Sequence, residues 1–228
     1  RNPQLSEGKV IYQSGADMRL YDLNKQQDQL LNVSLVSDFD QSRQRYIKNP
    51  LEFLSNVQPA SKEEKIVVTA RGHLSIAGNS SHRRIDIVLP NGARARDAVF
   101  SQDDKFVYAF VDSTGENEIW RFPLQGNGKP EQLSKDGQFH RLAIYPSPDG
   151  KYLAHTDKRG RLWLLELASK QNVVIDDAGK IGMGTHDEVV WSVDSKTIAL
   201  TRANSTMGRN QIGLFDLASK QVNFVTTD

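Results

Sequence analysis

A short turn motif that recurs five times along the chain is the feature that most constrains its fold. In its fullest form, at residues 147–151, the motif reads Ser-Pro-Asp-Gly-Lys and leads into the β-prone run Tyr152–Thr156. The closing lysines stand at positions 9, 65, 105, 151 and 196, so the steps between copies are 56, 40, 46 and 45 residues. Three of these steps match the repeat length of about 40–50 residues that is typical of a propeller blade. A polar insertion at residues 37–45 accounts for the longer first step.

The residues around each turn repeat the same succession of strands. An Asp-Gly or Asp-Asp turn joins two β-prone runs, because these residues tolerate a tight reversal of the chain. A polar loop and a third strand follow, and the third strand ends in an aliphatic–acidic–aliphatic triplet such as Leu165–Leu167 or Phe215–Leu217. A more polar fourth strand closes the unit, at 172–175 and 222–226 in the last two copies. The sequence therefore predicts an all-β fold, a partial β-propeller of about five blades, each a four-stranded antiparallel sheet.

Two other folds fit this pattern less well, and the repeat also places the blade boundaries. A β-sandwich is not expected to repeat the same turn and strand residues at a fixed period, and no window shows the apolar period of about 3.6 residues that a helical solenoid requires. Taken as one partial propeller domain over 1–228, the chain divides into units at about 1–48, 49–92, 93–137, 138–180 and 181–228. Because only eight residues precede Lys9, the first blade is predicted to be incomplete, lacking most of its innermost strand. We expect a segment of a larger propeller, whose unpaired strand edges would favour association into a homo-oligomer.

Composition and charge argue against several classes of partner. Lys and Arg total 29 against 28 Asp and Glu, a formal net charge of +1 that offers no general attraction to nucleic acid or to an anionic membrane. No apolar stretch approaches the roughly 20 residues that span a bilayer. The chain contains no cysteine, which excludes disulfide bonds and thiolate chemistry and is compatible with either the periplasm or the cytoplasm.

Several segments of the chain resemble one family of propellers. Residues 147–157, followed by Leu162–Leu165, resemble the WD-like blades of TolB and tricorn-type proteins. Four further segments, 6–17, 35–40, 67–72 and 113–120, are similar to the propeller region of bacterial tricorn-like serine proteases. The similarity runs over essentially the whole chain, and the order of these segments makes it more specific than blade motifs alone.

The resemblance implies that the parent protein is a large multidomain serine peptidase that assembles as an oligomer. In such enzymes two propellers precede a PDZ-like domain and the catalytic domains, and the propellers gate or channel peptides. This chain would form the opening part of the second propeller, with peptide substrates and the remaining protease domains as its partners. The family's catalytic residues lie downstream of the propellers, so none is carried onto this sequence. The resemblance favours a periplasmic over a cytoplasmic location.

The residues themselves offer no catalytic or metal-binding motif, so the chain is predicted to be non-catalytic and free of cofactors. A Gly-x-Ser-x-Gly elbow is absent, and the five histidines (His73, His82, His140, His155 and His186) lack the spacing of metal ligands. The segment Gly179–Gly184 superficially resembles a phosphate-binding loop, but it lies between blades without a strand-loop-helix context, which favours a linking loop. Trp120, Trp163 and Trp191 lie among apolar residues in predicted strands and are expected to pack between blades.

One set of charged residues is a candidate peptide-binding site. The innermost strands of a propeller line its central channel, and here the starts of those strands carry charge. The candidate channel residues are Arg94, Arg96, His140, Arg141, Asp187 and Glu188. A basic sector beside an acidic one could hold peptide termini or side chains electrostatically. The simpler interpretation is that these residues are only the polar ends of strands, and both interpretations stay open at this point.

Two functions follow from these observations. The first is a non-catalytic propeller segment of a tricorn-like protease that gates or binds peptide substrates for a downstream catalytic domain. The second is a stand-alone TolB-like scaffold that binds a partner protein on one face of the propeller. The incomplete first blade favours the protease segment, because a stand-alone scaffold is expected to close on itself.

Overall fold

The computed structural model describes most of the chain, in the following ranges: 2–34, 36, 38–40, 43, 45–78, 83–90, 92–124, 128–137, 139–181, 186, 188–203 and 210–226. In these residues the protein consists of twenty strands in five four-stranded antiparallel sheets, with two short 3-10 helices and no α-helix. The predicted all-β propeller fold is therefore confirmed. The contacts divide the chain into two compact units, residues 1–48 and residues 49–228.

Each sheet follows the chain in order, and we call the sheets blades 1 to 5. Blade 1 contains β1 (Gln4–Ser6), β2 (Lys9–Ser14), β3 (Asp17–Asp22) and β4 (Gln27–Leu31). The 3-10 helix η2 (Pro50–Phe53) precedes blade 2, which contains β5 (Leu54–Pro59), β6 (Lys65–Ala70), β7 (His73–Gly78) and β8 (Ile85–Ile87). Blade 3 contains β9 (Ala95–Phe100), β10 (Phe106–Val111), β11 (Glu118–Pro123) and β12 (Glu131–Gln132). Blade 4 contains β13 (Arg141–Pro146), β14 (Tyr152–Asp157), β15 (Arg161–Glu166) and β16 (Asn172–Asp177), followed by η3 (Ala178–Ile181). Blade 5 contains β17 (Val189–Trp191), β18 (Thr197–Ala203), β19 (Asn210–Asp216) and β20 (Gln221–Phe224).

The unit formed by residues 1–48 contains blade 1 alone. Its first strand, β1, is three residues long where the first strands of blades 2 to 4 have six, so the predicted shortfall is a shortened strand in a sheet that still has four. None of the described residues of this sheet is fully buried. A single sheet without a buried apolar face has little stability of its own.

The recurring turn motif has a simple hydrogen-bonded cause. In blades 3, 4 and 5 the serine that opens the motif donates to the aspartate two residues later, at 2.7 Å in each copy. The same hydroxyl accepts the backbone N–H five residues after the serine, at 2.9–3.0 Å. The two bonds fix a tight reversal between the first and second strands of the blade, which explains why serine and aspartate recur at these two positions.

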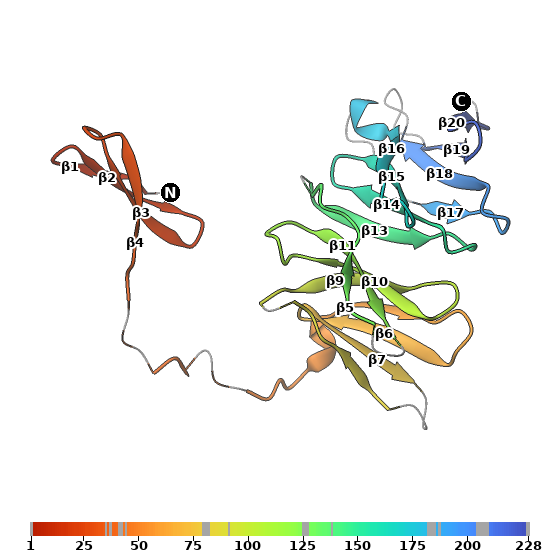
Figure 1. Ribbon diagram of the computed structural model, residues 1–228, viewed down its shortest axis with the longest axis horizontal. Helices are drawn as coiled ribbons and strands as arrows, with labels where there is room; N and C mark the ends of the chain where they lie inside the picture. Colours follow the sequence, from red (N-terminus) through yellow and green to blue (C-terminus); the bar gives the residue numbers. More distant parts are fainter. Residues whose placement is uncertain are drawn as a thin grey trace. The chain divides into compact units, whose positions relative to one another are not determined.

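Packing between blades 2 to 5 buries both faces of the second strands of blades 3 and 4, β10 and β14. In β10 the side chains alternate: Val107, Ala109 and Val111 join the core between blades 2 and 3. Tyr108 and Phe110 point the other way, into the core between blades 3 and 4. A third cluster, which includes Ile198 and Phe215, fills the space between blades 4 and 5. Figure 1 shows these four blades stacked in chain order. Because successive strand residues point to opposite faces, a run of uninterrupted apolar residues is what a strand buried on both sides requires.

The turn motif also connects one blade to the next. The Asp104 carboxylate, in the turn of blade 3, accepts the backbone N–H groups of residues 61, 62 and 63 in the turn of blade 2, at 2.6–3.1 Å. In blade 5 the equivalent Ser195 hydroxyl accepts the N–H of Asp149 in blade 4, at 2.9 Å. The fourth position of the motif therefore holds neighbouring blades in register when its side chain can accept a hydrogen bond. Blade 4 has Gly150 at this position and makes no such side-chain bond.

Candidate functional site: the inner groove and the charged pocket

The first strands of blades 2 to 5 lie next to one another on the inner side of the stack. Strand β9 contacts β5 and β13, and β13 contacts β17. Three of these strands carry a register irregularity near their start, between Leu54 and Asn56 in β5, between Arg96 and Val99 in β9, and between Arg141 and Ala143 in β13. Such β-bulges turn side chains away from the regular alternation of a strand. The repeated bulges therefore decide which residues these inner strands present.

A groove of about 610 Å³ runs across these inner strands, and we call it the inner groove. Its two walls differ in chemistry. The wall formed by blades 2 and 3 carries polar side chains, Asn56, Gln58, Ser61, Asp97 and Gln102, next to the apolar residues Pro59, Val99 and Phe100. The wall formed by blades 4 and 5 is apolar and includes Leu142, Tyr145, Pro148, Val190 and Trp191. Val190 is 62% exposed, so the apolar wall is open to a ligand. Hydrogen-bonding groups opposite an apolar wall can bind a chain that has a polar backbone and apolar side chains.

Trp191 helps to hold the apolar wall in place. Its indole N–H donates to the backbone carbonyl of Tyr145 in blade 4 at 2.9 Å, and its ring stacks on that of Tyr152. Trp120 packs in the core between blades 2 and 3, so for these two tryptophans the predicted role between blades is confirmed. For Trp163 the role between blades stays a prediction: its ring stacks on His155 and its N–H donates to Asp157, both in strand β14 of its own blade.

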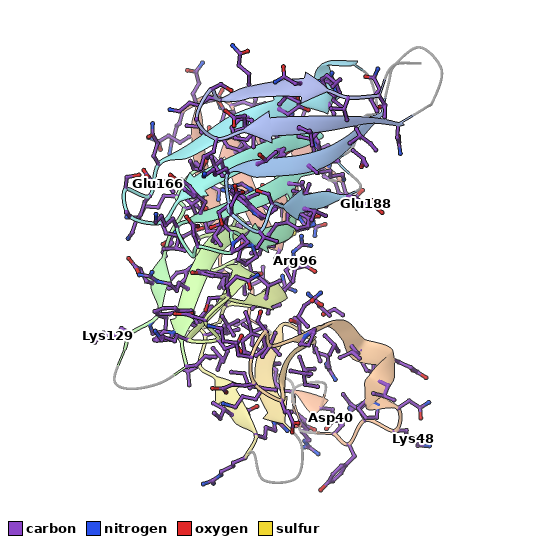
Figure 2. All side chains as sticks on the ribbon, turned by 90° about the vertical axis from the view of Figure 1, so that its right-hand side faces the viewer. Asp40, Lys48, Arg96, Lys129, Glu166 and Glu188 are labelled. Carbon is purple, nitrogen blue, oxygen red and sulfur yellow. The ribbon has the colours of Figure 1, made fainter. Side chains whose placement is uncertain are left out.

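A second cavity, of about 650 Å³, lies at the edge of blades 2 to 4 where their first strands begin, and we call it the charged pocket. Its ionisable lining residues are Arg71, Arg94, Arg96, Asp112, Glu116 and His140. Figure 2 shows Arg96 and Glu188 on one side of the four-blade unit and Lys129 and Glu166 on the opposite side. The charged pocket brings together three of the predicted channel residues, Arg94, Arg96 and His140. Its other ionisable residues, Arg71, Asp112 and Glu116, were not predicted.

Arg96 and His140 form a contact between blade 3 and the start of blade 4. The Arg96 Nη1 lies 2.5 Å from the Nε2 of His140, and its Nη2 donates to the backbone carbonyl of Arg141. A guanidinium group only donates, so His140 must accept through an unprotonated Nε2. Burial and the charge of Arg96 both lower the pKa of His140 below its ordinary value, in agreement with a neutral ring. The histidine thus orients Arg96 while remaining exposed itself.

Arg94 is positioned by Asp112 and by a close approach to Gly72. The Asp112 carboxylate accepts the backbone N–H of Arg94 at 2.6 Å and its Nε at 3.1 Å. The backbone donation from Arg94 is the main reason that the pKa of Asp112 lies below its ordinary value. A Cβ on Gly72 would lie 2.8 Å from the Cβ of Arg94, and Gly72 has a φ of +80°, so both space and backbone conformation require glycine here. The Arg94 side chain itself remains 79% exposed.

Arg141 does not share this exposed position, because its side chain is 3% exposed and lies in a buried network between blades 3 and 4. Its Nη2 pairs with Asp136 at 2.6 Å and with the buried Glu118 at 3.3 Å, and its Nε donates to the carbonyl of Asn117 at 2.9 Å. Its Nη1 lies 3.3 Å from the ring of His155, which is also fully buried. The position of Arg141 is therefore that of an internal ion pair.

The network also fixes the tautomer of His155. Asn172 donates through its amide nitrogen to Asp136 at 2.9 Å, so its amide oxygen is left to accept from the Nε2 of His155 at 3.0 Å. The Nδ1 of His155 then carries no proton and faces the donating Arg141. Burial, and next to it the charge of Arg141, lower the pKa of His155 to about 3.

The remaining predicted residues lie elsewhere. Glu188 is exposed just before β17, and its backbone N–H donates to Thr201 at 3.0 Å. Asp187, His82 and Gly182–Gly184 lie outside the described residues, as does part of the predicted insertion at 37–45. Sequence reasoning missed the polar wall of the inner groove altogether. A partial signal was available, because Asn56, Asp97 and Val190 belong to first strands whose repeat spacing is visible in the sequence.

Two kinds of feature are absent from the described residues. No helix among them is both long and apolar enough to cross a membrane. No group of three or more histidine, cysteine or acidic side chains in the described part of the chain lies close enough together to hold a metal ion.

Comparison with known proteins places this fold among the propellers of proteases and of TolB. No family model matches the chain. A protein of Sulfurisphaera tokodaii, provisionally named a tricorn-like protease C-terminal subunit, is 23% identical over 203 residues, which is 88% of this chain and 22% of that protein. The crystal structure of the tricorn protease matches 96% of this chain and 21% of that chain, with a TM-score of 0.70 and 16% identity. TolB from Acinetobacter baumannii matches 98% of this chain and 67% of that chain, with a TM-score of 0.57 and 17% identity.

These similarities agree with the fold. The chain has a propeller fold similar to those of the tricorn protease and TolB, and it spans about a fifth of the length of the two tricorn proteins that it matches. The resemblance predicted from the sequence segments is thereby confirmed.

Proposed function

We propose that this chain is a propeller segment of a tricorn-like serine protease and that it binds peptide substrates in the inner groove, for a catalytic domain elsewhere in the parent protein. The parent would be a larger protease assembly, because the matching tricorn proteins are several times longer than this chain. The chain itself would act by binding and positioning the peptide, while peptide-bond hydrolysis would take place outside it.

The two-sided chemistry of the inner groove is the observation that carries this proposal. A peptide in an extended conformation presents backbone N–H and C=O groups as well as side chains along its length. The amides of Asn56 and Gln58 can donate to and accept from such a backbone, and the wall around Tyr145 and Trp191 can cover apolar side chains. The groove volume of about 610 Å³ also lies within the range of about 300–1,000 Å³ that is usual for ligand sites.

Binding of fluorescently labelled ten-residue peptides to the purified 228-residue chain, followed by fluorescence anisotropy, tests the proposal. We expect saturable binding that Val190→Glu weakens about tenfold, because a carboxylate on the apolar wall would lose water when a peptide covers it. Val193→Glu is the matched control: Val193 is 94% exposed, in the same blade, and does not line the groove. We expect that control to bind as the unmodified chain does.

Three results would contradict the proposal. The first is a chain that binds no peptide, and the second is equal binding by the Val190→Glu and Val193→Glu variants. The third is hydrolysis of the peptides by the purified chain. A chain that binds a folded protein partner but no peptide would favour the TolB-like scaffold instead.

A further inference from the structure

Asp97 has a left-handed backbone conformation although it lies inside a strand. Among the described residues other than glycine, ten have a positive φ, and Asp97 is the one that lies inside a strand, with a φ of 51°. It belongs to the bulge in β9, where Asp97 and Ala98 together face Ala109 of the neighbouring strand. A left-handed residue within a strand costs stability and persists where the surrounding structure holds it, commonly at functional sites. The bulge turns Asp97 into the inner groove, of which it is a lining residue.

Asp97 is also the one charged residue among the described residues that line the groove. Its carboxylate is 32% exposed, and its recorded ionic partner in the described part of the chain is Arg96, with the Nε 3.4 Å from the Oδ2. This pair is not a hydrogen bond, because the buried Nε of Arg96 has no hydrogen-bond partner. The other nitrogens of Arg96 are directed to His140 and to the carbonyl of Arg141, in the charged pocket.

The carboxylate is therefore only partly compensated by the protein. Burial raises the pKa of Asp97 above its ordinary value, and the positive charge of Arg96 opposes this increase only in part. A half-buried carboxylate to which the described residues donate no hydrogen bond is stabilised by any ligand that brings a positively charged donor to it. Among the described residues that line the groove no second charge would compete for such a donor, since the others are neutral.

We propose that Asp97 selects peptides that carry a primary ammonium group, either a lysine side chain or a free N-terminus, and pairs with that group at the polar wall of the inner groove. The residues next to the ammonium group in the peptide would lie on the apolar wall, against Tyr145 and Trp191. This inference rests on the proposed function, since it specifies which peptides the groove prefers.

Four labelled peptides of otherwise identical apolar sequence test the inference by fluorescence anisotropy. They carry an internal lysine with an acetylated N-terminus, a free N-terminus without lysine, both groups, or acetyllysine with an acetylated N-terminus. We expect the charged peptides to bind about tenfold more tightly than the uncharged one, as for a partly buried charge pair at an interface. The first two peptides distinguish the two sources of the ammonium group.

Asp97→Asn is the decisive variant, because asparagine tolerates a left-handed backbone as well as aspartate does while removing the charge. It should abolish the preference for the charged peptides. Glu131→Gln is the matched control, since it removes one acidic charge from the same blade at strand β12, outside both the inner groove and the charged pocket, and the preference should persist. The affinities of the four peptides for the unmodified chain test the inference even if Asp97→Asn folds poorly.

The outcomes separate this inference from the proposed function. Equal binding of charged and uncharged peptides, or a preference that survives in Asp97→Asn, would overturn the role of Asp97 and leave peptide binding intact. If none of the four peptides binds, the proposed function itself fails.

Discussion

Replacing Arg141 with methionine is expected to destabilise the unit of residues 49–228 while leaving its exposed surface unchanged. The substitution removes a guanidinium that is 3% exposed but keeps an unbranched side chain of similar length. It leaves Glu118, which is 4% exposed, without its cationic partner between blades 3 and 4. Asp136 loses the same partner, but it is 40% exposed and can be solvated by water.

The size of the stability loss depends on the hydrogen-bond donors that Glu118 retains. Removing one member of a buried ion pair costs about 3–5 kcal/mol, because the remaining charge is uncompensated. Glu118 keeps the hydroxyl of Ser134 and the backbone N–H of Gly137 as donors, so we expect a loss near the lower limit, about 3 kcal/mol. For a unit of this size, such a loss lowers the melting temperature by roughly 6–12 °C.

Thermal unfolding followed by circular dichroism measures this effect, and two further variants sharpen it. Arg94→Met removes an arginine that is 79% exposed and should change stability by no more than about 0.5 kcal/mol. Adding Glu118→Gln to Arg141→Met removes the uncompensated charge and should recover part of the lost stability. If Arg141→Met melts within a degree or so of Arg94→Met, or if the double variant is no more stable than the single one, the assignment of Arg141 to a structural network is wrong.

Two other predictions concern the contacts between blades and the buried histidine. Asp104→Ala should lower the free energy of unfolding by about 2 kcal/mol, because three backbone N–H groups in the turn of blade 2 lose a charged acceptor, and a urea midpoint equal to that of the unmodified chain would contradict this. The pKa of His155 is lowered to about 3, mainly by burial. On acidification, this histidine therefore takes up a proton at a higher pH in the unfolded chain than in the folded chain. Stability is therefore complete above about pH 6.5 and falls toward pH 3 at up to about 1.4 kcal/mol per pH unit. Urea midpoints at pH 7.5 and pH 5.5 measure the decrease, which should be smaller in His155→Gln; an equal decrease in both proteins would show that other groups cause it.

The turn motif and the strand order could be predicted because their causes are local. The Ser147 hydroxyl donates to Asp149 within the motif and accepts from the N–H of Tyr152, the next residue after it, so the same residues must recur wherever the turn recurs. The charged starts of the first strands were also visible, and Arg94, Arg96 and His140 do meet in one pocket. Arg96 and His140 are 44 residues apart, about the length of one blade, which places them at the same end of neighbouring sheets.

The inner groove and the burial of Arg141 depend on partners that are distant in the sequence. Arg141 is buried because Glu118 and His155 come from two other strands, and a lone arginine at the start of a strand gives no indication of this. The Asp97 side chain points into the inner groove because of a bulge, and this bulge is set by the pairing of β9 with β10 and not by the residues of β9 alone. In blades that are buried on both faces, apolar periodicity does not indicate which residues line a groove.

Site-specific photo-crosslinking tests most directly the central claim that a peptide occupies the inner groove. A photoreactive phenylalanine derivative is placed at Val190 in one protein and at Val193 in another, and each is irradiated with a labelled lysine-containing peptide. The account predicts that the peptide is captured at position 190, that excess unlabelled peptide prevents the capture, and that position 193 captures little. Equal capture at the two positions, or no capture at position 190 under conditions where the peptide binds, would contradict it.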